Sequence, residues 1–226
     1  MAVLLNNGAL FLHIPKTGGT WVTRVLREAG LMRCSIGHRH ANLDHLLAPS
    51  ARNLGKRLEW QWKRTLFLRT RPRPFTFCFV RHPLRWYESF YLYKSQPGIA
   101  WERDGDEWDV QRWHPNALLN GLGEGRDFNE FVSAVLDRHP GYVSALFDHF
   151  TFRPVDFIGK QENLRDDLAA VLERLDCAFD PDLVHKKKRI NTSGETPQRP
   201  RWDATVRERA LRLERPALER FGYSLE

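Results

Sequence analysis

The chain has 226 residues, of which 42% are hydrophobic, 12% aromatic and 28% charged. This length fits one α/β-sized domain, or one with an elaborate insertion, and the composition excludes a disordered, collagen-like or low-complexity protein. The net charge of +7 indicates an anionic partner, such as a nucleic acid, a phosphorylated cofactor or an acidic lipid. The 3 cysteines, odd in number and widely spaced, favour a reducing compartment. Since no apolar window reaches the roughly 18 residues of a membrane span, we expect a cytoplasmic protein.

Three short apolar runs, each followed by a segment with helical periodicity, determine the predicted fold. The runs cover residues 9–14, 75–80 and 155–159, and the helical segments cover residues 20–29, 83–94 and 162–175. Strands that alternate with helices pair in parallel, so we expect a three-layer α/β fold with a mainly parallel sheet flanked by helices. We expect a single domain over residues 1–226. The turns after the three strands should meet at one edge of the sheet, where such folds bind ligands.

Two further regions complete the chain. Residues 96–125 carry five glycines and several tryptophans and are expected to form a loop-rich insertion. Residues 203–221 are rich in arginine and are expected to form an amphipathic helix that covers part of the surface.

The turn after the first strand has the features of an anion-binding loop. Gly18 and Gly19 let the backbone approach a ligand and leave the N–H groups of the helix start exposed, and Lys16 adds a positive charge. An ordinary strand-to-helix turn would use similar residues. The Walker A pattern of nucleotide kinases is absent, because the lysine precedes the glycine pair. The residues that follow the other two strands are basic, where a kinase would place a carboxylate for Mg²⁺.

Two segments follow predicted strands and precede predicted helices. Residues 13–20 read His-Ile-Pro-Lys-Thr-Gly-Gly-Thr, and residues 81–91 read Arg-His-Pro-Leu-Arg-Trp-Tyr-Glu-Ser-Phe-Tyr. They resemble, in this order, the 5′-phosphosulfate-binding loop and the 3′-phosphate-binding segment of the carbohydrate-type, PAPS-dependent sulfotransferases. Weaker likenesses occur in residues 157–164 and 221–223. The resemblance covers nearly the whole chain and implies the P-loop-like fold of that family.

The resemblance implies that 3′-phosphoadenosine 5′-phosphosulfate (PAPS) is the sulfuryl donor and that no metal is required. Lys16 would then approach the oxygen that bridges phosphorus and sulfur and assist the leaving group. In the family a late basic loop also closes over the nucleotide, here at residues 186–189. The implied donor-binding residues are Lys16, Thr17, Gly18, Gly19, Thr20, Trp21, Arg81, Ser89, Lys188 and Arg189.

A histidine pair supplies the candidate general base. Side chains at positions i and i+2 of an extended segment project to one side, so His38 and His40 can face the same cleft. The glycosaminoglycan branch of the family has a similar His-x-His, and on that analogy His40 is our first choice and His38 our second. Other branches use a glutamate. A zinc site built from Cys34, His38, His40 and His45, or a purely structural pair, are the alternatives.

The acceptor is a hydroxyl group on a molecule that the sequence does not identify, an anionic glycan or a small molecule. Residues 52–73 hold eight basic residues and one acidic residue interleaved with tryptophans, a pattern that suits an anionic acceptor, a nucleic acid or membrane surface, or a solvated helix. We do not expect a nucleic-acid partner. The alternatives to sulfuryl transfer are a non-catalytic nucleotide- or polyanion-binding module and a P-loop kinase.

Overall fold

A computed structural model describes residues 2–37, 40–47, 73–99, 101, 115–187 and 199–225, without the side chains of His45, Leu47 and Pro115. The described residues fall into two compact units. The first unit comes from Met1–Val80 and His149–Ile190, and the second from Arg81–Asp148 and Asn191–Glu226. We describe each unit by itself, and a single domain over residues 1–226 stays a prediction. Among the described residues, no helix has the length and apolar character to cross a membrane.

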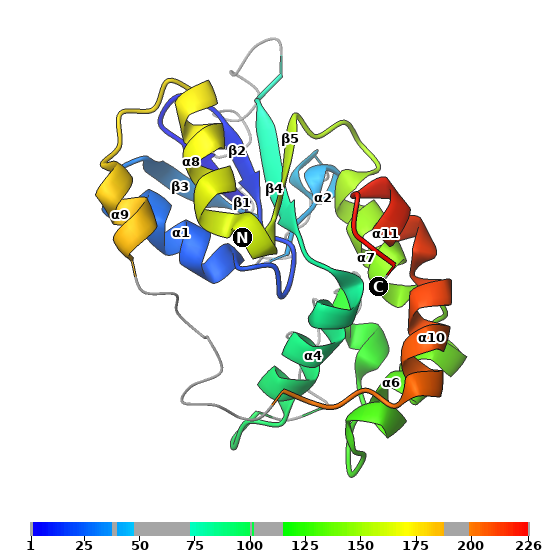
Figure 1. Ribbon diagram of the computed structural model, residues 1–226. Coiled ribbons are helices and arrows are strands. Elements are labelled where there is room, and N and C mark those ends of the chain that lie inside the picture. The colour runs from blue at the N-terminus through cyan, green and yellow to red at the C-terminus, as the bar shows by residue number, and fades with distance from the viewer. Residues whose placement is uncertain are drawn as a thin grey trace, which may run out of the picture. The chain divides into compact units, whose positions relative to one another are not determined.

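A mixed, largely parallel sheet forms the centre of the first unit (Figure 1). Within the described residues its strand order is β3-β1-β2-β4-β5. The strands are β1 Ala2–Leu5, β2 Leu10–Leu12, β3 Met32–Ile36, β4 Thr76–Val80 and β5 Phe157–Lys160. The three predicted strands are β2, β4 and β5, and they pair in parallel, with Leu10 opposite Thr76 and Phe77 opposite Phe157. The predicted α/β fold is therefore confirmed.

Two antiparallel strands at one edge of the sheet were not predicted from the sequence. β1 pairs with β2 through a tight turn in which Gly8 has a φ of 89°, and β3 pairs with the other side of β1. The sequence of β3, Met-Arg-Cys-Ser-Ile, alternates apolar and polar residues, which is the signal that could have predicted it, and most of its side chains are only partly buried. Its place in the sheet, beside β1, has no such local signal.

Helices cover the sheet of the first unit. They are α1 Gly19–Glu28, α2 Leu43–Leu47, the 3₁₀ turn η2 Gln161–Asn163, α8 Leu164–Arg174 and α9 Pro181–Lys186. Figure 1 shows α1 and α8 on the same side of the sheet. There Trp21 and Val25 of α1 join Leu168 of α8 and Phe77 and Phe79 of β4 in one buried apolar cluster. The opposite face of the strands carries Leu4, Leu10, Leu12 and Cys78, which are also fully buried.

The second unit is helical. Its elements are α4 Pro83–Lys94, η1 Pro115–Leu119, α6 Phe128–Arg138, the start of α7 Tyr142–Thr151, α10 Ala204–Leu213 and α11 Arg215–Arg220. α4 has the predicted bounds. The single helix expected over residues 203–221 is instead two helices that meet at Glu214. Pro216 explains the break, because proline has no N–H and is tolerated only in the first turn of a helix.

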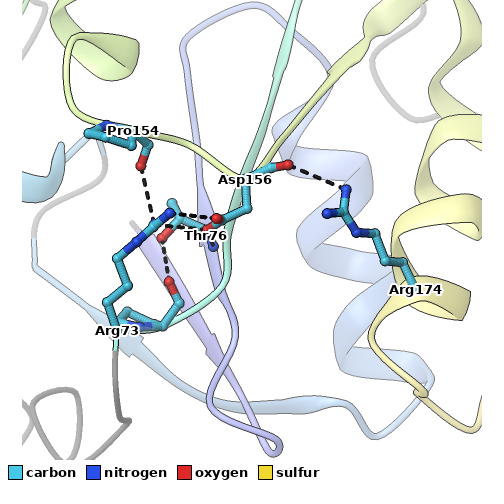
Figure 2. Close-up of polar contacts among 6 residues, drawn as sticks. Arg73, Thr76, Pro154, Asp156 and Arg174 are labelled. Atoms are coloured by element: carbon cyan, nitrogen blue, oxygen red, sulfur yellow. Dashed lines mark hydrogen bonds and ion pairs between the residues drawn. The ribbon is translucent and has the colours of Figure 1, made fainter.

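An ion pair fixes the end of the basic segment 52–73 to the sheet (Figure 2). The Arg73 guanidinium donates to both carboxylate oxygens of Asp156, at 2.9 and 2.6 Å, and the Thr76 N–H donates to Asp156 Oδ2 at 2.8 Å. These contacts join the amino ends of β4 and β5. Because β2 is parallel to both strands, the turn that follows β2 lies at the other end of the strands. Arg73 therefore has a structural role, and the other basic residues of the segment lie outside the described part of the chain.

Candidate functional site

The turn between β2 and α1, residues 13–20, carries the candidate phosphosulfate loop. Thr17 is buried, and its hydroxyl donates to the Ile14 carbonyl at 2.9 Å, which closes the loop tightly. Lys16 has a φ of 64°, a left-handed conformation that costs a non-glycine residue about 1–2 kcal/mol. Such strain is concentrated at ligand-binding sites in proteins. The turn lies at the carboxyl end of β2, a central strand of the sheet. Lys16 is partly exposed there.

Both glycines of this turn are required by their surroundings. Gly18 has a φ of 88°, and a Cβ at this position would lie 2.6 Å from Leu164 Cδ2 at the start of α8. A Cβ at Gly19 would overlap the imidazole ring of His13. The backbone of the loop thus packs directly against the side chains of Leu164 and His13. Neither position 18 nor position 19 has room for a residue larger than glycine.

The start of α1 is suited to binding an anion. Its N-cap is Gly18, which provides no side chain to cap the helix, and no acidic residue lies in the first turn. The first N–H groups of a helix have no partner within it, and the helix dipole places partial positive charge there. Together with the Lys16 ammonium, these groups fit a phosphosulfate. They are the residues that could hold the 5′ end of PAPS.

His40 lies directly against this loop. Its Nδ1 is 3.1 Å from the His13 carbonyl oxygen, and the two imidazole rings are 5.0 Å apart at an angle of 70°. Both side chains are 8% exposed. Since a carbonyl can only accept, Nδ1 of His40 carries the proton, and in the neutral ring Nε2 then holds the basic lone pair. His38, the second candidate base, lies outside the described residues.

Trp21 is a buried donor at the start of α1. The residue is 2% exposed and belongs to the apolar cluster between α1, α8 and the sheet. Its indole Nε1 has no hydrogen-bond partner among the residues that the structure describes. Buried indole N–H groups usually have one.

Arg81 and Ser89, the candidate 3′-phosphate ligands, belong to the second unit. Arg81 follows β4 directly and Ser89 is the seventh residue of α4, and both are partly exposed. His82 lies between them and caps α4, its Nδ1 accepting a hydrogen bond from the Leu84 N–H at 3.2 Å. Arg85 in the same segment is paired with Glu88 at 2.9 Å.

The late basic segment is described only at its start. Lys186 pairs with Asp182 at 2.7 Å. Lys187 pairs with Glu28 of α1, and its carbonyl accepts from Arg165 Nη2 at 2.9 Å. Desolvation and the nearby Arg24 guanidinium lower the pKa of Lys187. These two lysines are thus engaged within the first unit, and Lys188 and Arg189 lie outside the described residues.

Sequence reasoning did not find two of the groups that build these sites. The motif indicates His13 only as the first residue of the loop, although its ring contacts Gly19 and its carbonyl binds His40. Glu214, a fully buried carboxylate, was missed as well. No group of three or more histidine, cysteine, aspartate or glutamate side chains that could hold a metal occurs in the described part of the chain. The zinc alternative included His38 and the His45 side chain, which are not described.

Comparisons with known proteins give the family. Neither the curated proteins nor the solved structures give a match. The model of one family, described as the sulfotransferase family, matches residues 3–220. This range includes both candidate motifs and the five described strands, except for Ala2, the first residue of β1. Because this match spans almost the entire chain, the chain belongs to the sulfotransferase family.

Proposed function

We propose that this sulfotransferase moves the sulfuryl group from PAPS to an acceptor hydroxyl by in-line displacement. The observation that carries the proposal is the turn after β2, where Lys16, an uncapped helix start and a buried histidine occupy one short loop. An anionic donor with a sulfuryl group at its 5′ end matches the positive charge and the narrow backbone approach of that loop.

The proposal assigns the donor contacts to two sets of residues. The 5′-phosphosulfate would be bound by the N–H groups of residues 17–20 and by Lys16, with Trp21 next to them. Arg81 and Ser89 would bind the 3′-phosphate, because an arginine and a hydroxyl both donate to phosphate oxygens. The resemblance of the late basic segment adds Lys188 and Arg189. Hydrogen bonds to charged groups contribute about 1.5–3 kcal/mol each, so the two phosphates dominate recognition.

Lys16 has the catalytic role at the leaving group. PAPS supplies the sulfuryl group: its bond from sulfur to the phosphate oxygen breaks as a bond from sulfur to the acceptor oxygen forms. Negative charge therefore develops on the departing phosphate, where the Lys16 ammonium stabilises it. The rigid left-handed turn at Lys16 supports this role, since a preorganised charge needs no reorganisation during the reaction.

His40 takes the proton of the acceptor hydroxyl at Nε2. The His13 carbonyl supports this role. Its oxygen lies 3.1 Å from Nδ1 of His40, where it accepts the Nδ1 proton and stabilises the imidazolium that forms. The products are a sulfate ester and 3′-phosphoadenosine 5′-phosphate (PAP). His38 is the second choice for the base. The acceptor itself, an anionic glycan or a small molecule, and the cytoplasmic location stay predictions.

Binding measurements separate this proposal from its alternatives. Calorimetry without Mg²⁺ should show selective binding of PAP, whereas preference for ATP would favour a kinase and preference for RNA a polyanion-binding module. Incubation with PAPS and a panel of hydroxyl acceptors, followed by mass spectrometry, should reveal a product 80 Da heavier, about the mass that a sulfuryl group adds.

Substitution of Lys16 tests its role at the leaving group. Lys16→Met should lower the turnover about 10²–10³-fold, the loss typical of removing one transition-state donor. The control is Arg209→Met, which also replaces a basic side chain by methionine; Arg209 lies in α10, outside the assigned sites, and is paired with Asp137. Turnover of Lys16→Met within a few-fold of the Arg209→Met value would refute the assignment.

A further inference from the structure

The C-terminal segment contacts the candidate 3′-phosphate segment at three points. The His82 ring lies 5.3 Å from the Tyr223 ring at an angle of 68°. The Tyr87 hydroxyl donates to Glu214 at 2.7 Å, and the Trp202 indole donates to Glu88 at 2.9 Å. All three contacts fall between Arg81 and Ser89, so residues 202–223 support the N-cap and the first two turns of α4.

Glu214 is the centre of this support. Its carboxylate is fully buried and accepts four hydrogen bonds, from the Tyr87 hydroxyl, the Val143 N–H, and the N–H and hydroxyl of Ser144, at 2.7, 3.0, 2.8 and 2.7 Å. The two N–H groups belong to the first turn of α7, whose dipole compensates the buried negative charge. The Ser144 hydroxyl also accepts from the Ala217 N–H of α11 at 3.2 Å. One carboxylate thus connects α4, α7 and α11.

The position of α4 along its axis depends on these contacts. Tyr87 and Ser89 are two residues apart in one helix, so any rotation or shift of α4 that breaks the bond to Glu214 also moves the Ser89 hydroxyl. A hydrogen bond to a phosphate oxygen tolerates only a few tenths of an ångström around 2.8 Å. The same contacts therefore determine whether Ser89 can reach a ligand.

Glu88 is held by its neighbours as well. It is 5% exposed and adjacent to Ser89, and an unpaired carboxylate there would repel an approaching phosphate. The Arg85 guanidinium neutralises it at 2.9 Å, and the Trp202 indole fixes one of its oxygens. The C-terminal segment thus also controls the electrostatics next to Ser89.

We propose that Glu214 and Trp202 are positioning residues for recognition of the 3′-phosphate by Arg81 and Ser89. Neither residue touches the ligand in this proposal, and both act through α4. The inference rests on the proposed function, because it presumes that Arg81 and Ser89 bind the 3′-phosphate. It adds that recognition of that phosphate depends on a carboxylate 125 residues after Ser89 in the chain.

The test compares two nucleotides that differ only near this site. Calorimetry is done with PAP and with adenosine 5′-monophosphate, which lacks only the 3′-phosphate, on the full chain and on Glu214→Gln, Trp202→Phe and Tyr87→Phe. We expect each variant to bind PAP at least ten-fold more weakly, with the affinity for adenosine 5′-monophosphate changed less than two-fold. Tyr87→Phe removes a single hydroxyl, the one that donates to Glu214, and therefore tests the same contact if Glu214→Gln does not fold.

A stability control separates positioning from general destabilisation. Val135 is fully buried near the end of α6 in the same unit, so Val135→Ala should lower the melting temperature without changing the ratio of the two affinities. The inference is overturned if the variants at Glu214, Trp202 and Tyr87 leave that ratio unchanged, or if Val135→Ala changes it equally. If the unsubstituted chain binds PAP no better than adenosine 5′-monophosphate, the assignment of Arg81 and Ser89 fails instead.

Discussion

Replacement of Gly19 by alanine should destabilise the protein even though alanine is the better helix former. Gly19 is the first residue of α1, and an added Cβ would overlap the His13 ring. At a helical position without a neighbour, Gly→Ala stabilises by about 0.5–1 kcal/mol. Steric overlap in a packed site costs about 1–3 kcal/mol, because a ring or the backbone must move. The contact with His13 therefore reverses the sign of the substitution.

The size of the effect follows from these two terms. The midpoints of the two ranges differ by a net loss of about 1 kcal/mol in the free energy of unfolding. For a chain of this length, each kcal/mol lowers the melting temperature by about 2–4 °C, so we expect a decrease of about that size. A displaced His13 ring would also disturb the His40 ring, 5.0 Å away, and lower the turnover.

A double-mutant cycle with urea unfolding isolates the contact. In a His13→Ala background the ring is gone, and Gly19→Ala should become neutral or stabilising. Gly30→Ala is the matched control: Gly30 has a φ of 67° and no atom would lie within 4 Å of its Cβ, so only backbone strain of about 1 kcal/mol arises, in both backgrounds. The reasoning is refuted if Gly19→Ala alone is as stable as the unsubstituted protein.

Two further predictions concern His40 and Tyr87. His40→Ala should lower the turnover with PAPS about 10²–10⁴-fold while calorimetry shows unchanged PAP affinity, and near-normal turnover would exclude His40 as the base. Burial and the Glu214 carboxylate raise the pKa of Tyr87 well above 10, so the folded protein keeps this proton where the unfolded chain loses it. The Tyr87 contribution to stability is therefore complete below about pH 10 and is lost as the pH rises above it. Urea unfolding between pH 8 and 11 should show a shallower decline for Tyr87→Phe than for Tyr91→Phe, whose hydroxyl donates to the Arg126 carbonyl, and equal slopes would contradict the prediction.

Local chemistry explains what could be predicted of the candidate site. A buried run followed by two glycines and an apolar stripe specifies strand, tight turn and helix within 20 residues, and the structure has this order at β2 and α1. Proline after Arg81 and His82 specifies the start of α4 in the same way, since it is favoured in the first turn of a helix. Such signals depend only on neighbours in the chain.

The sequence by itself thus determined the family motifs, the parallel pairing of three strands and the apolar faces of α1 and α8. Only the tertiary structure showed that β3 pairs with β1, that the His13 carbonyl orients His40, 27 residues away, and that Glu214 bonds Tyr87, 127 residues away. The physical reason is the same in each case. A carboxylate, a carbonyl or an edge strand acquires its role from the partner that folding places beside it, and no residue nearby in the chain specifies that partner.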